Sequence, residues 1–517
     1  MMSPVAWVFV AFMNVTLVLI GIARVGVRGF NVRSILEHKL GKTKSHAEWK
    51  AVAAQLDELE GLSEWSQDSK TRRFNAAEVR RRVNQLEDIK LRGDTQGLLT
   101  MLQADFHRVT CGITNPLLYS YRSQTKESIE RYVTLLTELV NNLPEAKGVS
   151  AVEKLNALRM VTRAYGRSAL MLNSSVALGG YHLGVIKALF HAGILPDTFF
   201  GCNTGAIVAA FICTHDDVES VYDTSMIDFS AFHKRSEKGS VKRKADRFWK
   251  EGTLMDVSVL SKFVEDNLGD ITFLEAFRQT GRVLNIHVEK ELDQQGSRSS
   301  WLLNYLTTPH VLVRTAAVAS CALRGFYKYV PLLAKTMSGD IVPFDPSPMN
   351  FANATINGFH VNQAVERIRE LFNINCFIVS DATIRHNPLL RLSQRRGFLP
   401  QFAHFFLEEV WRFTAAVSRI PILRSRLTAP LQVVREPIMG DVIINPVTKW
   451  ADLINLVLKN PDARLLEYCL KRGEQATWPR LAQIRTHLSV EKALHSAIHE
   501  IEAGLSGRDL MSSHKSC

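Results

Sequence analysis

The feature that most constrains the fold of this chain is a strand–loop–helix pattern in residues 169–210. Ala169–Leu172 is a short apolar run suited to a buried strand. Small residues follow in a predicted loop, and residues 181–192 then carry apolar side chains at helical spacing. We therefore expect a strand and a helix joined by a tight connection, as in α/β folds.

A second apolar run, residues 198–200, leads into the turn Gly201-Cys202-Asn203-Thr204-Gly205, after which helical spacing resumes. A strand, a turn with glycines two residues on either side of a central residue, and a helix make up a nucleophile elbow, G-x-S-x-G. The central residue here is Asn203, not serine. Asn is among the non-glycine residues that best hold a positive φ. The turn is therefore expected to keep its shape without a hydroxyl nucleophile.

Composition allows two or three ordinary globular domains in 517 residues. The net charge of +12 permits contact with anionic surfaces, either phospholipid or nucleic acid. Because no nucleic-acid-binding signature accompanies the charge, we expect no nucleic-acid partner. The seven cysteines are scattered and form no C-x-x-C pair, which favours reduced thiols in a cytosol-facing protein over disulfides or zinc. No metal and no organic cofactor is expected.

Residues 1–30 are predicted to be a membrane anchor. Pro4–Ala23 is nearly all apolar and about long enough to span a bilayer. Arg24, Arg28 and Arg33 follow it, which favours a cytosolic position for the rest of the chain. A buried core helix is the alternative, and the segment could either span a bilayer or lie in a monolayer.

Three further regions follow. Helical patterns between residues 45 and 150 predict an all-helical domain, with amphipathic stretches such as Glu127–Val140. Residues 165–385 are predicted to form the α/β domain, in which the apolar run Cys376–Ser380 is expected to be a buried parallel strand. Residues 386–517 are predicted to be mainly helical.

Two basic segments have open interpretations. Lys234–Lys250 carries eight Lys and Arg residues and ends in Phe248 and Trp249, which suits either a face that contacts lipid headgroups or a solvated surface loop. Leu399–Leu427 combines aromatic residues with arginines, which suits either an amphipathic membrane-facing element or packing on the α/β domain.

Short motifs along most of the chain, each weak alone, agree in number and order with one family. The first is Leu178–Leu189, LGGYHLGVIKAL, followed by the turn at Asn203. The others are Trp49–Leu56, Asn115–Tyr119, Asp270–Ala276, Thr280–Ile286, Ala319–Leu323, Leu371–Ser380, Gly440–Ile444 and Gly473–Pro479. Together they resemble the patatin-like phospholipases, in the branch of triacylglycerol lipases of lipid droplets. The resemblance implies a three-layer α/β domain with a mostly parallel central sheet, flanked by helical regions.

The resemblance also implies a Ser–Asp catalytic dyad, with the elbow serine as nucleophile and the aspartate of an Asp-Gly dipeptide as base. The nucleophile position falls on Asn203 and, with a one-residue gap before Leu371, the aspartate position falls on Asn357. A carboxamide has no hydroxyl to deprotonate and cannot take up the proton. Losing the nucleophile of a comparable serine hydrolase costs on the order of 10⁶ in kcat.

The family's oxyanion loop, usually S-G-G-A, reads Asn173-Ser174-Ser175-Val176 here. Glycines serve in such a loop because the backbone must approach the ligand in conformations that other residues adopt at a cost. Two serines are therefore expected to close or re-aim the loop.

Several residues could substitute for the missing groups. Ser174 or Ser175 could be a displaced nucleophile, whereas the side chains of Cys202 and Thr204 are expected to point away from the pocket. His182 belongs to the family's Y-H-x-G packing motif and is expected to be structural. The candidates for a substitute base are Asp340, Asp345 and Asp381.

The sequence thus predicts a membrane-anchored, cytosol-facing protein of the endoplasmic reticulum or lipid droplets that has lost catalysis. It would bind acyl lipid or regulate an active lipase of the same family. Two different functions are also compatible with the sequence: an active triacylglycerol lipase or phospholipase with unorthodox catalytic residues, and a structural protein of the droplet surface with a filled pocket.

Overall fold

The computed structural model describes most of the chain outside its N-terminus and the long segment after residue 382. The described residues are 32–68, 72–104, 106–174, 179–223, 225–233, 240–251, 253, 255–291, 298–322, 327–345, 353–354, 360–382, 440–445 and 462–513.

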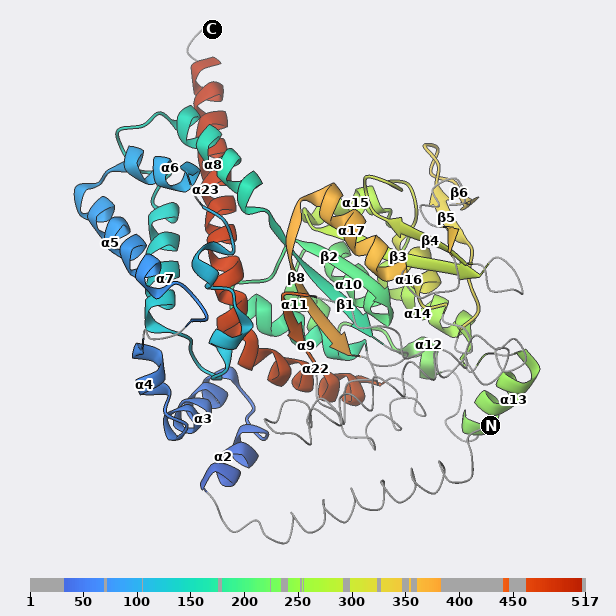
Figure 1. Cartoon of the computed structure of the whole chain (residues 1–517). Helices are drawn as coiled ribbons and strands as arrows, with labels where there is room; N and C mark the ends of the chain where they lie inside the picture. Colours follow the sequence, from blue (N-terminus) through green and yellow to red (C-terminus); the bar gives the residue numbers. More distant parts are fainter. Residues whose placement is uncertain are drawn as a thin grey trace.

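A seven-stranded sheet with the order β7-β4-β3-β2-β1-β8-β9 is the centre of the fold (Figure 1). The strands are β1 (Arg167–Ser174), β2 (Thr198–Asn203), β3 (Val283–Glu291), β4 (Arg298–Leu303), β7 (Asn353–Ala354), β8 (Ile374–Ala382) and β9 (Val442–Ile444). Neighbours from β3 to β9 are parallel, whereas β4 and β7 pair antiparallel. The predicted mostly parallel sheet is confirmed, including the buried strand that contains Cys376–Ser380.

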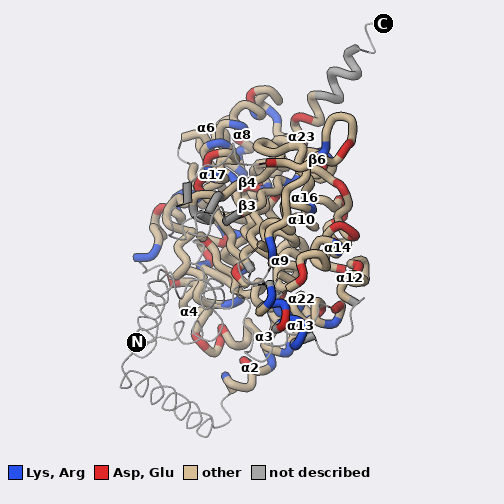
Figure 2. The backbone as a smooth tube through the Cα atoms, turned by 90° about the vertical axis from the view of Figure 1, so that its right-hand side faces the viewer, with Lys and Arg blue, Asp and Glu red and all other residues tan. Residues whose placement is uncertain are grey.

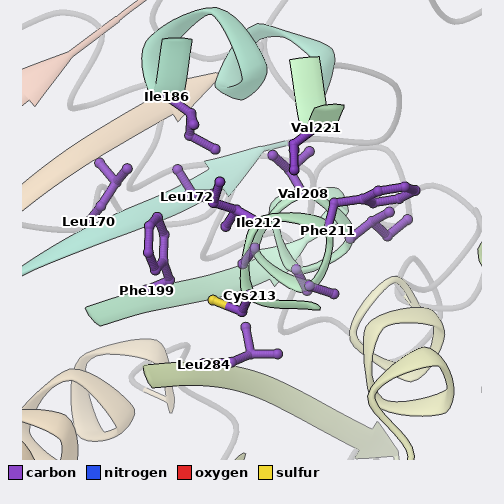
Figure 3. Close-up of a cluster of buried hydrophobic side chains, with 14 of the residues drawn as sticks. Leu170, Leu172, Ile186, Phe199, Val208, Phe211, Ile212, Cys213, Val221 and Leu284 are labelled. Atoms are coloured by element: carbon purple, nitrogen blue, oxygen red, sulfur yellow. The ribbon is translucent and has the colours of Figure 1, made fainter. Parts of the chain in front are cut away.

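Helices cover both faces of this sheet. On one face, Leu170 and Leu172 of β1 and Phe199 of β2 pack against Ile186 of α9 (Gly180–His191) and Ile212 of α10 (Thr204–Thr214), as Figure 3 shows. On the other face, Ala169, Met171 and Phe200 pack against α17 (His360–Phe372). This division follows from the alternation of side chains along each strand, and it gives the three layers that the sequence predicts.

The remaining helices of the α/β part border these layers. They are α11 (Val218–Tyr222), α12 (Ser230–His233), α13 (Ser240–Glu251), α14 (Val257–Leu268), α15 (Phe273–Thr280), α16 (Val313–Ser320) and α22 (Ala463–Thr477). A separate two-stranded hairpin consists of β5 (Leu332–Lys335) and β6 (Ile341–Phe344).

A second hydrophobic core lies between the N-terminal helices from residue 76 onward and the C-terminal helix α23, whereas Trp49 and Ala53 pack in the core of the α/β part. The N-terminal helices are α2 (Val32–Leu40), α3 (His46–Leu59), α4 (Leu62–Gln67), α5 (Ala76–Arg92), α6 (Thr95–Ala104), α7 (Glu127–Asn141) and α8 (Ala151–Tyr165), with single 3₁₀ turns at Thr110–Gly112 and Pro116–Tyr119. Helix α23 (Leu481–Ser513) follows the 3₁₀ turn Trp478–Arg480 and contributes Leu494 and Ala497 to the core formed with Leu136 and Leu158 (Figure 1).

The connection after β1 differs from the predicted loop. Asn173 and Ser174 continue the strand, because Ser174 is flanked by Asn203 of β2 and Ala382 of β8 in the sheet register. Ser175 and Val176 lie outside the described residues. The predicted oxyanion positions therefore begin inside the sheet, at the carboxyl end of its central strand.

Two of the predicted membrane elements fall outside the described residues. They are the predicted anchor in residues 1–30 and the segment Leu399–Leu427. Within the described part of the chain, no helix combines the length and the apolar character that crossing a membrane requires. The basic segment Lys234–Lys250, for which a loop was one interpretation, forms helix α13 from Ser240 onward.

Candidate functional site

The turn at Asn203 has the backbone geometry of an elbow. Asn203 ends β2, and Thr204 begins α10, so the direction of the chain changes at a single residue. Asn203 has φ 54° and ψ −131°, which is the positive φ that the sequence predicts. This conformation is one that glycine adopts most readily, and in other residues it costs of order 1–3 kcal/mol.

The two glycines of the turn are required by close packing. A Cβ at Gly201 would lie 2.4 Å from Cα of Ala206, and one at Gly205 would lie 2.1 Å from the carbonyl oxygen of Leu172. Both contacts are with backbone atoms, which cannot move aside without displacing the strand or the helix. The shape of the elbow is therefore built into the packing of β1, β2 and α10.

The backbone of Asn203 is held by a serine from another element. Its N–H donates to Oγ of Ser320, at the end of α16, over 3.0 Å. Oγ of Ser320 in turn donates to the carbonyl oxygen of His287 over 2.6 Å. Ser320 thus connects β2 to β3, and its hydroxyl is committed to structure.

The side chain at the elbow provides an amide where a serine hydrolase provides a hydroxyl. Asn203 is partly buried, and its Nδ2 lies 3.7 Å from Sγ of Cys202. A carboxamide at this position can donate and accept hydrogen bonds to a bound molecule. It cannot form the acyl ester that covalent hydrolysis requires.

Cys202 lies beneath the elbow, on the α17 face of the sheet. Its side chain is 1% exposed and packs with Met171 and Phe200. Sγ lies 3.7 Å from Nδ1 of His287, whose Nε2 is 2.8 Å from Oγ of Ser300. These buried contacts tie β2, β3 and β4 together.

Sequence reasoning missed the pairing of Cys202 with His287. The available signal was the alternation in β3, where the polar residues Asn285, His287 and Glu289 alternate with the apolar residues Leu284, Ile286 and Val288. That alternation predicts a polar face, but the cross-strand partner depends on a register that the sequence does not reveal.

Asn173 occupies the same edge on the central strand. Its side chain is buried, and its Nδ2 donates to Oδ1 of Asp381 over 3.2 Å. Asp381, a candidate for the missing base, thus lies at the carboxyl end of β8 beside an amide.

The remaining candidates for the base lie in different parts of the chain. Asp340 lies in the turn of the β5–β6 hairpin, where its Oδ2 accepts from Ser338, and Asp345 directly follows β6. Asn357, at the position of the family's aspartate, lies outside the described residues. Of the three candidate aspartates, Asp381 is therefore the one that the register places at the same edge of the sheet as the elbow.

His182 is fully buried in the first turns of α9. Its Nδ1 lies 2.7 Å from Oγ of Ser380 in β8. Burial lowers the pKa of His182 to about 3, so the imidazole is neutral near pH 7. A base with so low a pKa is ineffective at neutral pH, which favours the structural role expected from the sequence.

Titratable residues of the described part of the chain offer no cluster suited to a metal ion. The polar groups described at the elbow and its edge of the sheet are amides, hydroxyls, the thiol of Cys202 and the buried carboxyl group of Asp381.

Two family models match successive parts of this chain. Residues 170–341 match the family described as patatin-like phospholipase, and residues 27–163 match a domain of unknown function, DUF3336. The first match contains β1, the elbow and α16.

Similar proteins from fungi and a plant carry lipase names. Triacylglycerol lipase 4 of Saccharomyces cerevisiae is 28% identical over 497 residues, which cover 91% of this chain and 54% of the yeast protein. Triacylglycerol lipase SDP1L of Arabidopsis thaliana is 26% identical, with 88% of this chain and 57% of the relative covered. Triacylglycerol lipase ptl3 of Schizosaccharomyces pombe is 26% identical, with 88% and 95% covered. The chain spans little more than half the length of the first two relatives. It contains a patatin-like phospholipase domain and has homologues named triacylglycerol lipase along most of its length.

Proposed function

We propose that this chain acts in lipid metabolism as a patatin-like homologue of the triacylglycerol lipases that no longer hydrolyses esters. Its retained fold would bind acyl lipid or regulate an active lipase of the same family. The observation that carries the proposal is the amide of Asn203 at the apex of an intact elbow. The shape that would present a nucleophile is kept, and the nucleophile is replaced.

The neighbouring groups support this proposal. The hydroxyl of Ser320 is engaged on both sides, by the N–H of Asn203 and the carbonyl of His287. The thiol of Cys202 is buried on the α17 face of the sheet, in contact with the core. Neither is placed to attack an acyl carbonyl bound above the elbow. The predicted loss of the aspartate at Asn357 and of the loop glycines at Ser174 and Ser175 points the same way.

Hydrolysis is the first test. Purified protein is incubated with triolein and with phosphatidylcholine, with a relative named triacylglycerol lipase as the positive control. We expect no release of fatty acid above background. Turnover that disappears on substitution of Ser174, Ser175 or Cys202 would instead establish an enzyme with unorthodox catalytic residues.

Restoring the family residues is the second test. The double variant Asn203→Ser/Asn357→Asp is expected to recover little activity, because Ser174 and Ser175 still stand where the family has glycines. Recovery close to the rate of the positive control would mean that the oxyanion loop is competent, and that only two side chains separate this chain from an enzyme.

Lipid binding and regulation are tested separately. Lipid extracted from the purified chain is analysed for bound acyl chains, and the chain is added to the active relative while fatty acid release is followed. Bound acyl lipid or a change in the relative's rate supports the proposal. Absence of both effects contradicts it and favours a structural role.

We propose further that residues 1–30 anchor the chain to the endoplasmic reticulum or lipid droplets. The apolar run Pro4–Ala23 with its arginine flank supports this. Deletion of these residues is expected to release the protein from vesicles of phosphatidylcholine into the soluble fraction, and retention on those vesicles would contradict the anchor.

A further inference from the structure

Helix α13 has a composition unlike a core helix. Within its twelve residues it carries five cations and two acidic residues. The cations are Lys242, Arg243, Lys244, Arg247 and Lys250. Within this cluster, burial and, to a smaller extent, the charge of the neighbouring Arg243 lower the pKa of Lys244. A nearby anion would relieve the crowding of positive charge.

The same helix is amphipathic in sequence. Val241, Ala245, Phe248 and Trp249 recur at helical spacing among the charged residues. The side chain of Trp249 is 72% exposed. A basic helix with an exposed tryptophan has the features of helices that lie in the interface of a lipid surface, where the indole ring sits at headgroup level.

An ion pair joins helix α13 to the next helix of the chain. Arg247 forms an ion pair with Asp256 over 3.0 Å, and Asp256 also caps the N-terminus of α14. No other helix or strand in the described residues packs extensively against α13. The helix therefore stands at the margin of the fold, as Figure 1 shows.

The position of α13 relates it to the candidate site. In Figures 1 and 2, α13 lies at the same lower end of the molecule as α22 and α3. Strand β8, the orange arrow in Figure 1, points toward this end, and β1 and β2 run parallel to it. In Figure 2 the blue of Lys and Arg is concentrated along α13. Helix α13 and the carboxyl edge of the parallel strands therefore lie toward the same end of the molecule.

We propose that α13 is a docking helix for a lipid surface that contains anionic phospholipid. The exposed cations Lys242, Arg243 and Lys250 contact the phosphate and carboxylate groups of the headgroups, and Trp249 inserts at the level of the glycerol backbone. The inference rests on the proposed function in that it assumes a lipid surface as the place of action. It holds equally for an active or an inactive chain.

The strength of the contact follows from its charges. Each Lys or Arg near an anionic leaflet strengthens binding about fivefold, so removing three lowers it on the order of 100-fold. Salt weakens such binding because it screens charges beyond about 10 Å at 0.1 M. A basic helix also attracts nucleic acid, but an exposed tryptophan beside apolar residues is better accounted for by a lipid interface.

The experiment measures partition of the full chain onto vesicles of phosphatidylcholine, with and without phosphatidylserine. An N-terminal anchor would insert into both kinds of vesicle, so the readout is the increase that phosphatidylserine produces. The variant Lys242→Gln/Arg243→Gln/Lys250→Gln removes three exposed cations and is expected to reduce this increase on the order of 100-fold. The control Lys90→Gln/Arg92→Gln/Lys147→Gln removes the same charge from exposed positions of the N-terminal helical region and is expected to keep it.

Amide hydrogen exchange provides a local readout. Residues 240–251 are expected to gain protection on vesicles with phosphatidylserine, and Trp249→Ala is expected to reduce that protection. The proposal is overturned if phosphatidylserine increases the partition of both triple variants equally. It is also overturned if residues 240–251 gain no protection on vesicles with phosphatidylserine. Protection by a nucleic-acid duplex but not by vesicles also overturns it. Because this experiment does not depend on ester hydrolysis, a failure of the proposed loss of catalysis leaves its result unaffected.

Discussion

The two ends of the central strands differ in the chemistry they carry. At the amino end, the buried guanidinium of Arg108 donates to Oγ of Ser168, to Oε2 of Glu491, to Oδ1 of Asn375 and to the carbonyl oxygen of His487. At the carboxyl end, the elbow presents an amide. At the amino end, a buried ion pair therefore joins separate parts of the chain. At the apex of the elbow the side chain is a neutral amide, and the buried carboxyl group at that edge, Asp381, accepts from another amide, that of Asn173.

The amino end connects three parts of the chain. Arg108 belongs to the N-terminal helical region, Ser168 to β1, and Glu491 to α23. Glu491 also accepts hydrogen bonds from the N–H and Oγ of Ser168. Arg108 and Glu491 are both buried. Loss of either ion therefore leaves the other buried without its counter-ion. The two ends therefore differ in kind: the amino end joins three parts of the chain through buried ions, whereas the elbow presents a neutral side chain.

The largest effect is expected from Arg108→Met. This substitution leaves Glu491 buried without its cation, which should lower the free energy of unfolding by about 3–5 kcal/mol. Urea denaturation measures the change. The control is Arg92→Met, which removes an arginine that is 73% exposed and is expected to cost less than about 1 kcal/mol.

A double-mutant cycle sharpens this result. Arg108→Met/Glu491→Leu removes both ions, so its cost is expected to be smaller than the sum of the two single variants. If the changes in the free energy of unfolding simply add, the two side chains act independently. The buried ion pair would then not explain the contrast between the two ends of the strands.

The carboxyl end was more predictable from the sequence than the amino end. The strand, elbow and helix around Asn203 are local, and their glycines, apolar runs and spacing lie within about 40 contiguous residues. The resemblance supplied the fold. The sequence also predicted α7 and the strand β8 closely, because both have strong periodicity or a continuous apolar run.

Contacts between distant segments were not predictable from the sequence. Arg108 lies in an irregular connection with no periodic pattern, and its partners at Ser168 and Glu491 are distant in sequence. Likewise, no local pattern shows that α23 completes the core of the N-terminal helices. Such contacts depend on how elements pack, which propensity and periodicity do not determine.

Buried histidines at both ends should make stability depend on pH. Burial lowers the pKa of His182 to about 3, and burial together with the charge of Arg108 lowers that of His487 to about 4. Between about pH 6.5 and about pH 4, the unfolded chain binds a proton at each imidazole that the folded chain does not. Stability should therefore fall as the pH is lowered, with each histidine contributing up to about 1.4 kcal/mol per pH unit.

Histidine variants test this dependence at each end separately. His182→Gln and His487→Gln should each reduce the slope of unfolding free energy against pH, and the exposed His38→Gln serves as the control for loss of an imidazole. Arg108→Met should also reduce the slope, because it removes one cause of the low pKa of His487. A slope that none of these substitutions changes would assign the acid sensitivity to carboxyl groups.

The smallest expected effect is at the elbow itself. Asn203→Gly should raise the free energy of unfolding by about 1 kcal/mol, because glycine adopts φ 54° and ψ −131° without strain and only part of that gain is lost to the entropy of the unfolded chain. Asn203→Ala should lower it, since alanine tolerates positive φ less well. Equal stability of the two variants would show that the elbow is unstrained. A gain for glycine alone would mean that the packing of Gly201 and Gly205 holds the turn against a preference of the residue at its apex. The shape of the elbow would then depend on the surrounding architecture and not on the side chain at the position where the family carries its nucleophile.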